Sequence, residues 1–382
     1  MATIVFVGHE ASRTGAPFTQ LYLMQWIKQH TPHEVVLLLI WGGDLVPEFE
    51  KLGEVHILDH GKPAVTMKER ALAKLDRMTQ YRRKNIFRNI QKKNPAVIFA
   101  NTTITLDVAV ELKQLLGVKL IINVHELESV FYHYSSEEFA RNTAHVDWFI
   151  PGSNAVRNFY KQFCPIPDEK IKVIYDFINA NPPGTSTAVA VRAQHGIPEK
   201  AKIVGAIASL EWRKGADLFL RVAQEVLKHK PDTYFVWVGG KPSSFHFKEI
   251  TRDVRLTSLT ERVLFVGGKS DLRGYYEAFD VYLLTSREDP FPLVCLEAGL
   301  SGKPVICFEN SGGMPEYVRN DAGIQVPYLD TQMMAEQVMY LLDHPEEAQQ
   351  MGAVGRERVL QNHTIATIGP KMYEVIQACL PA

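Results

Sequence analysis

The chain has 382 residues, of which 46% are hydrophobic and 22% charged, and its 42 basic and 43 acidic side chains give a net charge of -1. This length predicts two domains, and the ordinary glycine and proline contents exclude collagenous and wholly disordered chains. The near-zero net charge provides no global attraction to nucleic acid or to anionic membranes. Its 4 cysteines form no C-x-x-C pair, which excludes a disulfide scaffold or structural zinc site and indicates a reducing compartment.

No stretch reaches the ~20 apolar residues of a membrane-spanning helix. The N-terminus starts with a strand-like apolar run and lacks the basic start and cleavage site of a secretory signal. The sequence therefore predicts a soluble, cytoplasmic protein.

Short apolar runs rich in β-branched residues alternate with amphipathic helical patterns along nearly the whole chain. The predicted strands cover residues 4–7, 35–39, 97–100, 120–124, 148–150, 173–175, 203–206, 234–238, 263–266, 281–284 and 304–308. Strands that are apolar on both faces and alternate with helices predict parallel sheets covered on both sides. The breaker-rich segment 181–187 predicts a linker.

The fold class is therefore α/β, with two doubly wound domains facing each other across a cleft. The predicted N-terminal domain covers residues 1–180 and the C-terminal domain covers 181–364. A closing helix within 365–382 is expected to pack back on the N-terminal domain.

Two short motifs carry no function. Gly268-Lys269-Ser270 lacks the earlier glycine of a phosphate-binding P-loop, because Val263 occupies that position. His56 and His60 have a metal-like spacing, but their context reads as a strand, which would separate them by roughly 13 Å. Metal catalysis therefore has no support in the sequence.

The most informative stretch follows the predicted strand 281–284. Pro292 suits the first turn of the next helix, where the free N–H groups of Leu293 and Val294 favour an anion. Asp289 and Glu297 flank this anion site, and acids in that position suit sugar hydroxyls better than phosphate. A second glycine-rich turn follows at Gly312-Gly313.

The spacing from Asp289 to Glu297, the Gly312-Gly313-Met314-Pro315-Glu316 turn and the basic loop Trp212-Arg213-Lys214-Gly215 resemble the retaining nucleotide-sugar glycosyltransferases of family four (glycosyl transferases group 1). The resemblance covers nearly the whole chain and is most specific in its C-terminal half. It implies the GT-B fold, with an N-terminal Rossmann-like domain on the acceptor side and a C-terminal Rossmann-like domain that binds the nucleotide sugar.

The resemblance also implies roles for individual residues. Lys214, helped by Arg213, would bind the donor diphosphate, Glu297 the ribose hydroxyls and Asp289 the donor sugar, while His125 would contact the sugar near the transferred bond. The implied catalytic residues are His125, Lys214 and Asp289, and the implied donor-binding residues are Gly15, Ala16, Arg213, Lys214, Gly239, Asp289, Phe291, Leu293, Val294 and Glu297. The chain departs from the family pattern at Ser209, Asp289 and Pro292, where Arg, Glu and Gly are usual.

The implied activity is metal-independent, retaining transfer of a sugar from a nucleotide diphosphate, UDP more than GDP, to a hydroxyl of a glycan or lipid-linked acceptor. No cofactor is expected, and the implied setting is polysaccharide, glycolipid or other glycoconjugate synthesis. The alternative is a non-catalytic GT-B protein that binds a nucleotide sugar or scaffolds a complex, which Ser209 and Asp289 favour.

Residues 67–95 combine ten basic side chains with interleaved apolar ones. Such a segment can lie on an anionic membrane, which would make the protein peripheral at the inner face of the membrane. An ordinary helix pair with a charged outer face explains the pattern equally well. Nucleic acid is disfavoured, because the rest of the chain is nearly neutral.

Overall fold

A computed structural model describes residues 1–59, 82–132, 136–181 and 184–381 of the chain. It divides into two compact units: unit 1 comprises Met1–Asp176 and Ile365–Ala382, and unit 2 comprises Phe177–Thr364. His60 and the basic residues up to 81 lie outside the described residues. No helix in the described ranges combines the length and apolarity needed to cross a membrane.

Unit 1 is built on a six-stranded parallel sheet with the strand order β3-β2-β1-β4-β5-β6. Its central strands are buried on both faces, and every residue of β1 is buried, as expected for strands covered by helices on two sides. Its elements are β1 (Thr3–Gly8), α1 (Gly15–His30), β2 (Glu34–Trp41), α2 (Val46–Glu50), β3 (Glu54–Asp59), a helix ending at residue 91, β4 (Pro95–Asn101), η1 (Thr103–Thr105), α4 (Leu106–Leu116), β5 (Lys119–Val124), α5 (Glu128–Phe131), α6 (Ser136–Thr143), β6 (Trp148–Pro151), α7 (Asn154–Phe163) and η2 (Asp168–Lys170).

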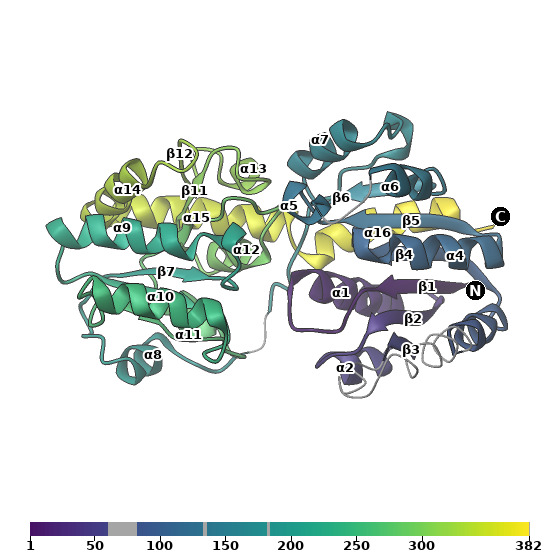
Figure 1. Cartoon of the computed structure of the whole chain (residues 1–382), viewed down its shortest axis with the longest axis horizontal. Coiled ribbons are helices and arrows are strands. Elements are labelled where there is room, and N and C mark those ends of the chain that lie inside the picture. The colour runs from purple at the N-terminus through teal and green to yellow at the C-terminus, as the bar shows by residue number, and fades with distance from the viewer. Residues whose placement is uncertain (60–81, 133–135, 182–183, 382) are drawn as a thin grey trace, which may run out of the picture. The chain divides into compact units, whose positions relative to one another are not determined.

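The helix α16 (Ile365–Cys379) completes unit 1 and packs against α1 and β4. In Figure 1 it is the yellow helix beside the purple and blue elements of this unit. Gly369 allows α16 to approach α1 closely, because a Cβ at this position would lie 2.7 Å from ring atoms of Trp26. His33 and Tyr373 add a side-chain hydrogen bond of 2.8 Å between Nε2 and the hydroxyl.

Unit 2 contains a second six-stranded parallel sheet, with the order β12-β11-β10-β7-β8-β9. Its strands are short and its central ones are fully buried, as in unit 1. Its elements are α8 (Ala188–Gln194), β7 (Ile203–Ile207), η3 (Trp212–Lys214), α9 (Ala216–His229), β8 (Tyr234–Val238), α10 (Phe245–Leu256), β9 (Val263–Phe265), α11 (Arg273–Ala278), β10 (Val281–Leu284), α12 (Leu293–Leu300), β11 (Val305–Phe308), α13 (Met314–Val318), β12 (Gly323–Val326), α14 (Thr331–Asp343) and α15 (Pro345–Asn362).

Two sequence predictions about strands differ from the structure. The predicted strand 173–175 is wrong: the chain there is irregular, and only Ile171 forms an isolated bridge, to Phe149. The sequence analysis does not predict the edge strand β12, because its four residues include Gly323 and Gln325 and only its two end residues are buried.

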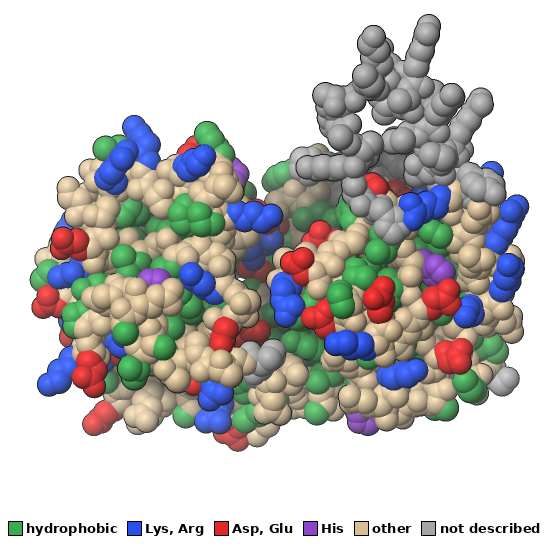
Figure 2. Space-filling model, turned by 90° about the horizontal axis from the view of Figure 1, so that it is seen from below, with side chains coloured by type: hydrophobic (Ala, Val, Ile, Leu, Met, Phe, Trp, Pro, Cys, Tyr) green, Lys and Arg blue, Asp and Glu red, His purple; other side chains and the backbone are tan. Residues whose placement is uncertain are grey.

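The surface reflects the balanced composition. On the face shown in Figure 2, basic and acidic side chains are interspersed over the described residues, without a large area of one sign. In the described part of the basic segment, residues 82–91 form a helix whose Phe87 and Ile90 join the core, while Arg82, Lys84 and Arg88 are exposed.

Candidate functional site

Each sheet has a point where the direction of its strand order reverses. In unit 2 this switch point lies between β7 and β10, and in unit 1 it lies between β1 and β4. In open parallel sheets, ligands bind beyond the carboxyl ends of the strands at this point. Most of the predicted site residues follow these strands or their neighbours.

In unit 2, Lys214 and Asp289 form a buried ion pair at the switch point. Lys214 follows β7 and Asp289 follows β10, and Nζ donates to Oδ2 at 2.5 Å. Their side chains are only 12% and 5% exposed, and Ser286 Oγ donates a second hydrogen bond to the same carboxylate oxygen. The structure therefore joins two predicted residues that are 75 positions apart.

Two glycines allow the loops around this pair to approach closely. Gly312 has a φ of +124°, and a Cβ there would lie 1.8 Å from the carbonyl oxygen of Asp289. Gly215 has a φ of +69°, and its Cβ would lie 2.0 Å from the carbonyl oxygen of Thr285. Larger residues at these positions would displace the backbone on both sides of the pair.

The helix α12 begins at Leu293, directly after the loop that carries Asp289. Pro292 is the N-cap residue and not part of the first turn, which corrects the sequence prediction by one position. No side chain caps this end, so the N–H groups of Leu293 and Val294 remain suited to an anion. Phe291 is buried, with its ring 5.2 Å from that of His363, so its side chain packs inside unit 2.

Glu297 lies one turn inside α12 and accepts a hydrogen bond of 2.6 Å from the Tyr276 hydroxyl. Burial raises the pKa of Glu297 above its ordinary value, although the bond from Tyr276 acts in the opposite direction. Its carboxylate does not contact the Lys214–Asp289 pair in any hydrogen bond or ion pair found among the described residues.

The remaining predicted residues of unit 2 flank the pair without joining it. Arg213 donates from Nε to Glu211 at 2.8 Å, and Ser209 Oγ donates to the other oxygen of Glu211 at 3.1 Å. Gly239 directly follows the strand β8 and has a φ of +134°, and a Cβ there would lie 1.9 Å from the carbonyl oxygen of Ala208. Arg213 is therefore held by Glu211, and among the described residues its side chain makes no hydrogen bond or ion pair with Lys214 or Asp289.

In unit 1, the predicted residues meet through an asparagine that the sequence analysis did not select. Asn101 ends β4, and its Nδ2 donates to the carbonyl oxygen of Ala16 at 2.8 Å. Its Oδ1 lies 2.9 Å from His125 Nε2, which also lies 2.9 Å from Asn123 Nδ2. Gly15 is the first residue of α1, so the start of this helix and the His125 ring are linked through one side chain.

His125 is also held from its other side. Its Nδ1 lies 3.0 Å from Asp176 Oδ2, and the two side chains are 10% and 5% exposed. Burial by itself lowers the pKa of His125, but the charge and hydrogen bond of Asp176 raise it, and the net pKa lies above the ordinary value. Both ring nitrogens thus have protein partners.

Glu126 is a further polar residue that the sequence analysis did not assign to the site. Its buried carboxylate accepts hydrogen bonds from the Thr103 amide at 3.0 Å, the Thr103 hydroxyl at 2.7 Å and the Tyr160 hydroxyl at 3.2 Å. A buried carboxylate with this many donors fixes the loop after β4 against the loop after β5. The sequence signal is weak, because Glu126 is simply the residue after His125.

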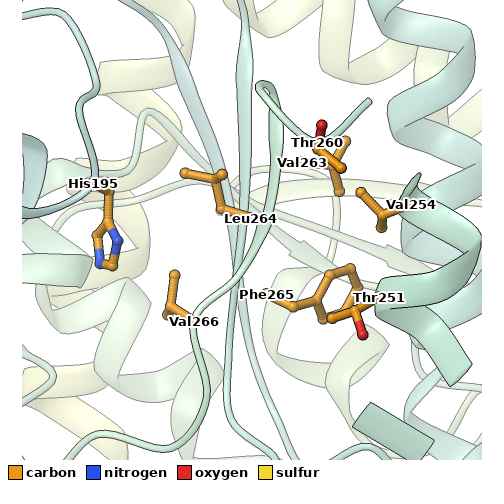
Figure 3. Close-up of a pocket in the computed structure, with 8 residues that line it drawn as sticks. All are labelled: His195, Thr251, Val254, Thr260, Val263, Leu264, Phe265 and Val266. Carbon is orange, nitrogen blue, oxygen red and sulfur yellow. The ribbon is translucent and has the colours of Figure 1, made fainter. Parts of the chain in front are cut away.

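No group of three or more histidine, cysteine, aspartate or glutamate side chains in the described ranges is arranged to hold a metal ion. A cavity of about 340 Å³ lies at the edge strand β9 of unit 2 (Figure 3). It is lined mainly by apolar side chains such as Phe265 and Val266, with His195 and Thr251 among them. None of the predicted site residues lines it.

Two family profiles match the chain. That of Glycosyl transferases group 1 matches residues 190–358, and that of Glycosyltransferase Family 4 matches residues 22–181. The D-inositol 3-phosphate glycosyltransferase of Corynebacterium diphtheriae is 32% identical over 47% of this chain and 43% of its own length. A GDP-mannose-dependent alpha-(1-6)-phosphatidylinositol monomannoside mannosyltransferase of Mycolicibacterium smegmatis is 28% identical over 51% and 52%. The chain thus spans about half the length of these curated relatives.

Solved structures show the same fold over the full length. The crystal structure of Anabaena Alr3699/HepE in complex with UDP-glucose has a TM-score of 0.83 and 19% identity, covering 99% of this chain and 100% of that chain. Sucrose-phosphate synthase from Thermosynechococcus elongatus has a TM-score of 0.80 and 21% identity, covering 99% of both chains. The predicted α/β fold of GT-B type, with two Rossmann-like domains, is confirmed. The two family profiles, which together cover most of the chain, establish that it belongs to the group 1 glycosyltransferases of family 4.

Proposed function

We propose that the chain is a retaining glycosyltransferase that moves a sugar from a nucleotide diphosphate donor to an acceptor hydroxyl without a metal ion. The observation that carries this proposal is the Lys214–Asp289 pair, buried at the switch point of unit 2 beside the uncapped start of α12. A lysine and a helix start at this place supply the positive charge that a departing diphosphate requires.

In the proposed reaction, the bond from the anomeric carbon of the sugar to the diphosphate oxygen breaks, and a bond from the same carbon to the acceptor oxygen forms. The acceptor proton passes to the leaving phosphate, so no nucleophile from the protein is needed. Lys214, with the start of α12, stabilises the departing charge. Glu297 holds the ribose hydroxyls, Asp289 holds the donor sugar, and His125 contacts the sugar near the transferred bond.

The ion pair between Lys214 and Asp289 affects which ligand the proposed site prefers. Lys214 is already neutralised by Asp289, so the diphosphate and the carboxylate compete for one ammonium group. A donor that brings its own sugar hydroxyls to Asp289 compensates that carboxylate, whereas a free nucleotide does not. The arrangement therefore favours an intact nucleotide sugar over the spent nucleotide.

We propose UDP in preference to GDP as the nucleotide of the donor, and a glycan or lipid-linked acceptor in glycoconjugate synthesis. Alr3699/HepE was crystallised with UDP-glucose, which supports UDP, whereas the name of the Mycolicibacterium relative specifies GDP-mannose. The acceptor class rests on the phosphatidylinositol and inositol phosphate acceptors named in those relatives.

The second candidate is a non-catalytic protein that binds a nucleotide sugar or scaffolds a complex. Ser209 favours it, because its hydroxyl bonds to Glu211 and supplies no charge to the pair. Donor consumption that requires an acceptor distinguishes transfer from this alternative.

Calorimetric titration with UDP, GDP and ADP, with and without magnesium, tests the donor site. We expect UDP to bind without metal, and Lys214→Ala to weaken it by about 1.5–3 kcal/mol, the range of a charge-assisted hydrogen bond. Lys228→Ala, which removes a lysine that pairs with Glu225 on the surface of α9, is the matched control and should not change the affinity. Failure of all three nucleotides to bind the wild-type protein would contradict the proposed function.

We also propose peripheral contact with anionic membranes through the basic segment, at the inner face of the membrane. In its described part, Lys93 is paired with Glu54 at 2.8 Å, whereas Arg88 and Lys92 are exposed. Flotation with neutral and anionic liposomes tests this contact, with Arg88→Glu/Lys92→Glu compared with Lys228→Glu. Equal recovery with both lipid mixtures would contradict it.

A further inference from the structure

Trp212 is an exposed aromatic residue beside the proposed donor site. It opens η3, two residues before Lys214, and is 68% exposed. Leaving a tryptophan in water forgoes the gain from burying one of the largest apolar surfaces in proteins. Its exposure therefore calls for an explanation beyond the fold.

The ring is nevertheless held in place. The Arg287 guanidinium lies 5.0 Å from the ring centre and donates to the Trp212 carbonyl oxygen at 2.9 Å. Both of its terminal nitrogens also bind Asp217, at 2.9 and 2.7 Å. A guanidinium fixed by three hydrogen bonds supports one face of the indole and keeps the remaining exposed surface in a defined orientation.

The loop after β12 extends this surface. The Tyr328 hydroxyl donates to the Arg287 carbonyl oxygen at 3.2 Å, and Tyr328 is itself 46% exposed. The next residue, Leu329, has a φ of +63° and remains 41% exposed. A leucine in this left-handed conformation is strained, and such strain clusters at functional sites.

From this arrangement we propose that Trp212 is a stacking platform for a pyranose ring of the acceptor glycan, an inference that rests on the proposed transferase function. A pyranose presents C–H groups on its ring faces, which fit the electron-rich face of an indole. Polar groups for its hydroxyls lie in the same loop, where the 57% exposed Glu211 joins Ser209 to Arg213.

The position of the platform argues against a nucleobase as the stacked group. The family resemblance implies that the turn at Gly239 lies beside the nucleotide base, and this turn follows β8, which lies on one side of β7 in the sheet. Trp212 instead contacts Arg287, and through it Tyr328, which follow β10 and β12 on the other side of β7. The platform and the predicted base turn therefore lie on opposite sides of Lys214.

Saturation-transfer NMR tests this platform, using maltotriose, mannotriose and triacetylchitotriose as probes with UDP or GDP at saturation. We expect at least one trisaccharide to bind the wild-type protein, and Trp212→Ala to weaken it about tenfold, in line with an aromatic stacking contact. Trp212→Phe should restore most of the affinity because it keeps an aromatic face. Phe245→Ala, which removes a 71% exposed ring from α10, is the control and should bind like wild type.

Nucleotide affinity, measured by calorimetry on the same variants, separates this inference from the proposed function. Unchanged nucleotide binding in Trp212→Ala, together with loss of the trisaccharide, supports the platform. Equal trisaccharide binding in wild type and Trp212→Ala, or no trisaccharide binding to a nucleotide-loaded wild-type protein, overturns it while leaving the donor site intact. Loss of nucleotide affinity equal to the loss of trisaccharide affinity would identify the platform as part of the nucleotide site and also overturn it.

Discussion

Replacing Lys214 with methionine removes one partner of a buried ion pair and leaves the other charged. The Asp289 side chain is only 5% exposed, and among the described residues its carboxylate accepts side-chain hydrogen bonds from Lys214 and Ser286. Removing one partner of a buried pair costs about 3–5 kcal/mol, because the remaining charge is uncompensated. Since the lysine is 12% exposed and water can reach its place, we expect about 3 kcal/mol, the lower end of that range.

A double-mutant cycle in urea unfolding measures this value. Lys214→Met/Asp289→Asn removes both charges, so it should be more stable than Lys214→Met alone, with a coupling energy of about 2 kcal/mol. Lys228→Met, which breaks an exposed pair on α9, should change the free energy of unfolding far less than Lys214→Met. If the two substitutions add within about 0.5 kcal/mol, the charges are not coupled and the reasoning fails.

Three further predictions concern the same loops and His125. Asp289→Asn should raise the affinity for free UDP about fivefold, because the Asp289 carboxylate no longer competes with the diphosphate for Lys214, and it should also slow sugar transfer. Calorimetry measures the affinity and a transfer assay the rate. An unchanged UDP affinity would contradict competition between the carboxylate and the diphosphate. Gly312→Ala should lower the melting temperature far more than Gly302→Ala, because a Cβ at Gly312 meets the Asp289 carbonyl oxygen whereas that at Gly302 meets nothing within 4 Å; similar melting temperatures would argue against this. Because the pKa of His125 is raised above 6.5 in the folded protein, its protonation stabilises the fold fully below that pH, and this contribution is lost as the pH rises through the folded-state pKa. In Asp176→Asn, burial should outweigh the remaining charge of Glu126 and bring the pKa of His125 below 6.5, as NMR titration of the ring would show. A pKa that stays raised would exclude Asp176 as the main cause.

The alternation of strands and helices was predictable because it depends on local patterns. Strands such as β1, which is buried throughout, carry apolar residues on both faces and are recognised without knowledge of their neighbours. The run at 173–175 is just as apolar locally, but it follows the edge strand β6 and forms no regular pairing there. Pairing is a property of the sheet, so an apolar run alone could not decide it.

In the site too, the sequence identifies individual residues but not the contacts between them. Lys214, Asp289 and His125 were recognised from motifs, but the bond between Lys214 and Asp289 depends on β7 lying beside β10. Asn101 and Asp176 hold His125 although they are 24 and 51 residues away from it. No local pattern marks either residue, because each takes its place only when the strands are ordered in the sheet.

The discontinuity of unit 1 affects the order in which the protein folds during synthesis. In the sequence, unit 2 lies between the two segments of unit 1. Near its two ends, Ile178 forms a β-bridge with Thr364, and the Ile178 amide donates a hydrogen bond of 2.9 Å to the His363 carbonyl oxygen. The ribosome therefore releases all of unit 2 before it releases α16. Until then α1 lacks the helix that covers Trp26, so the unit that is synthesised first is the last to be completed.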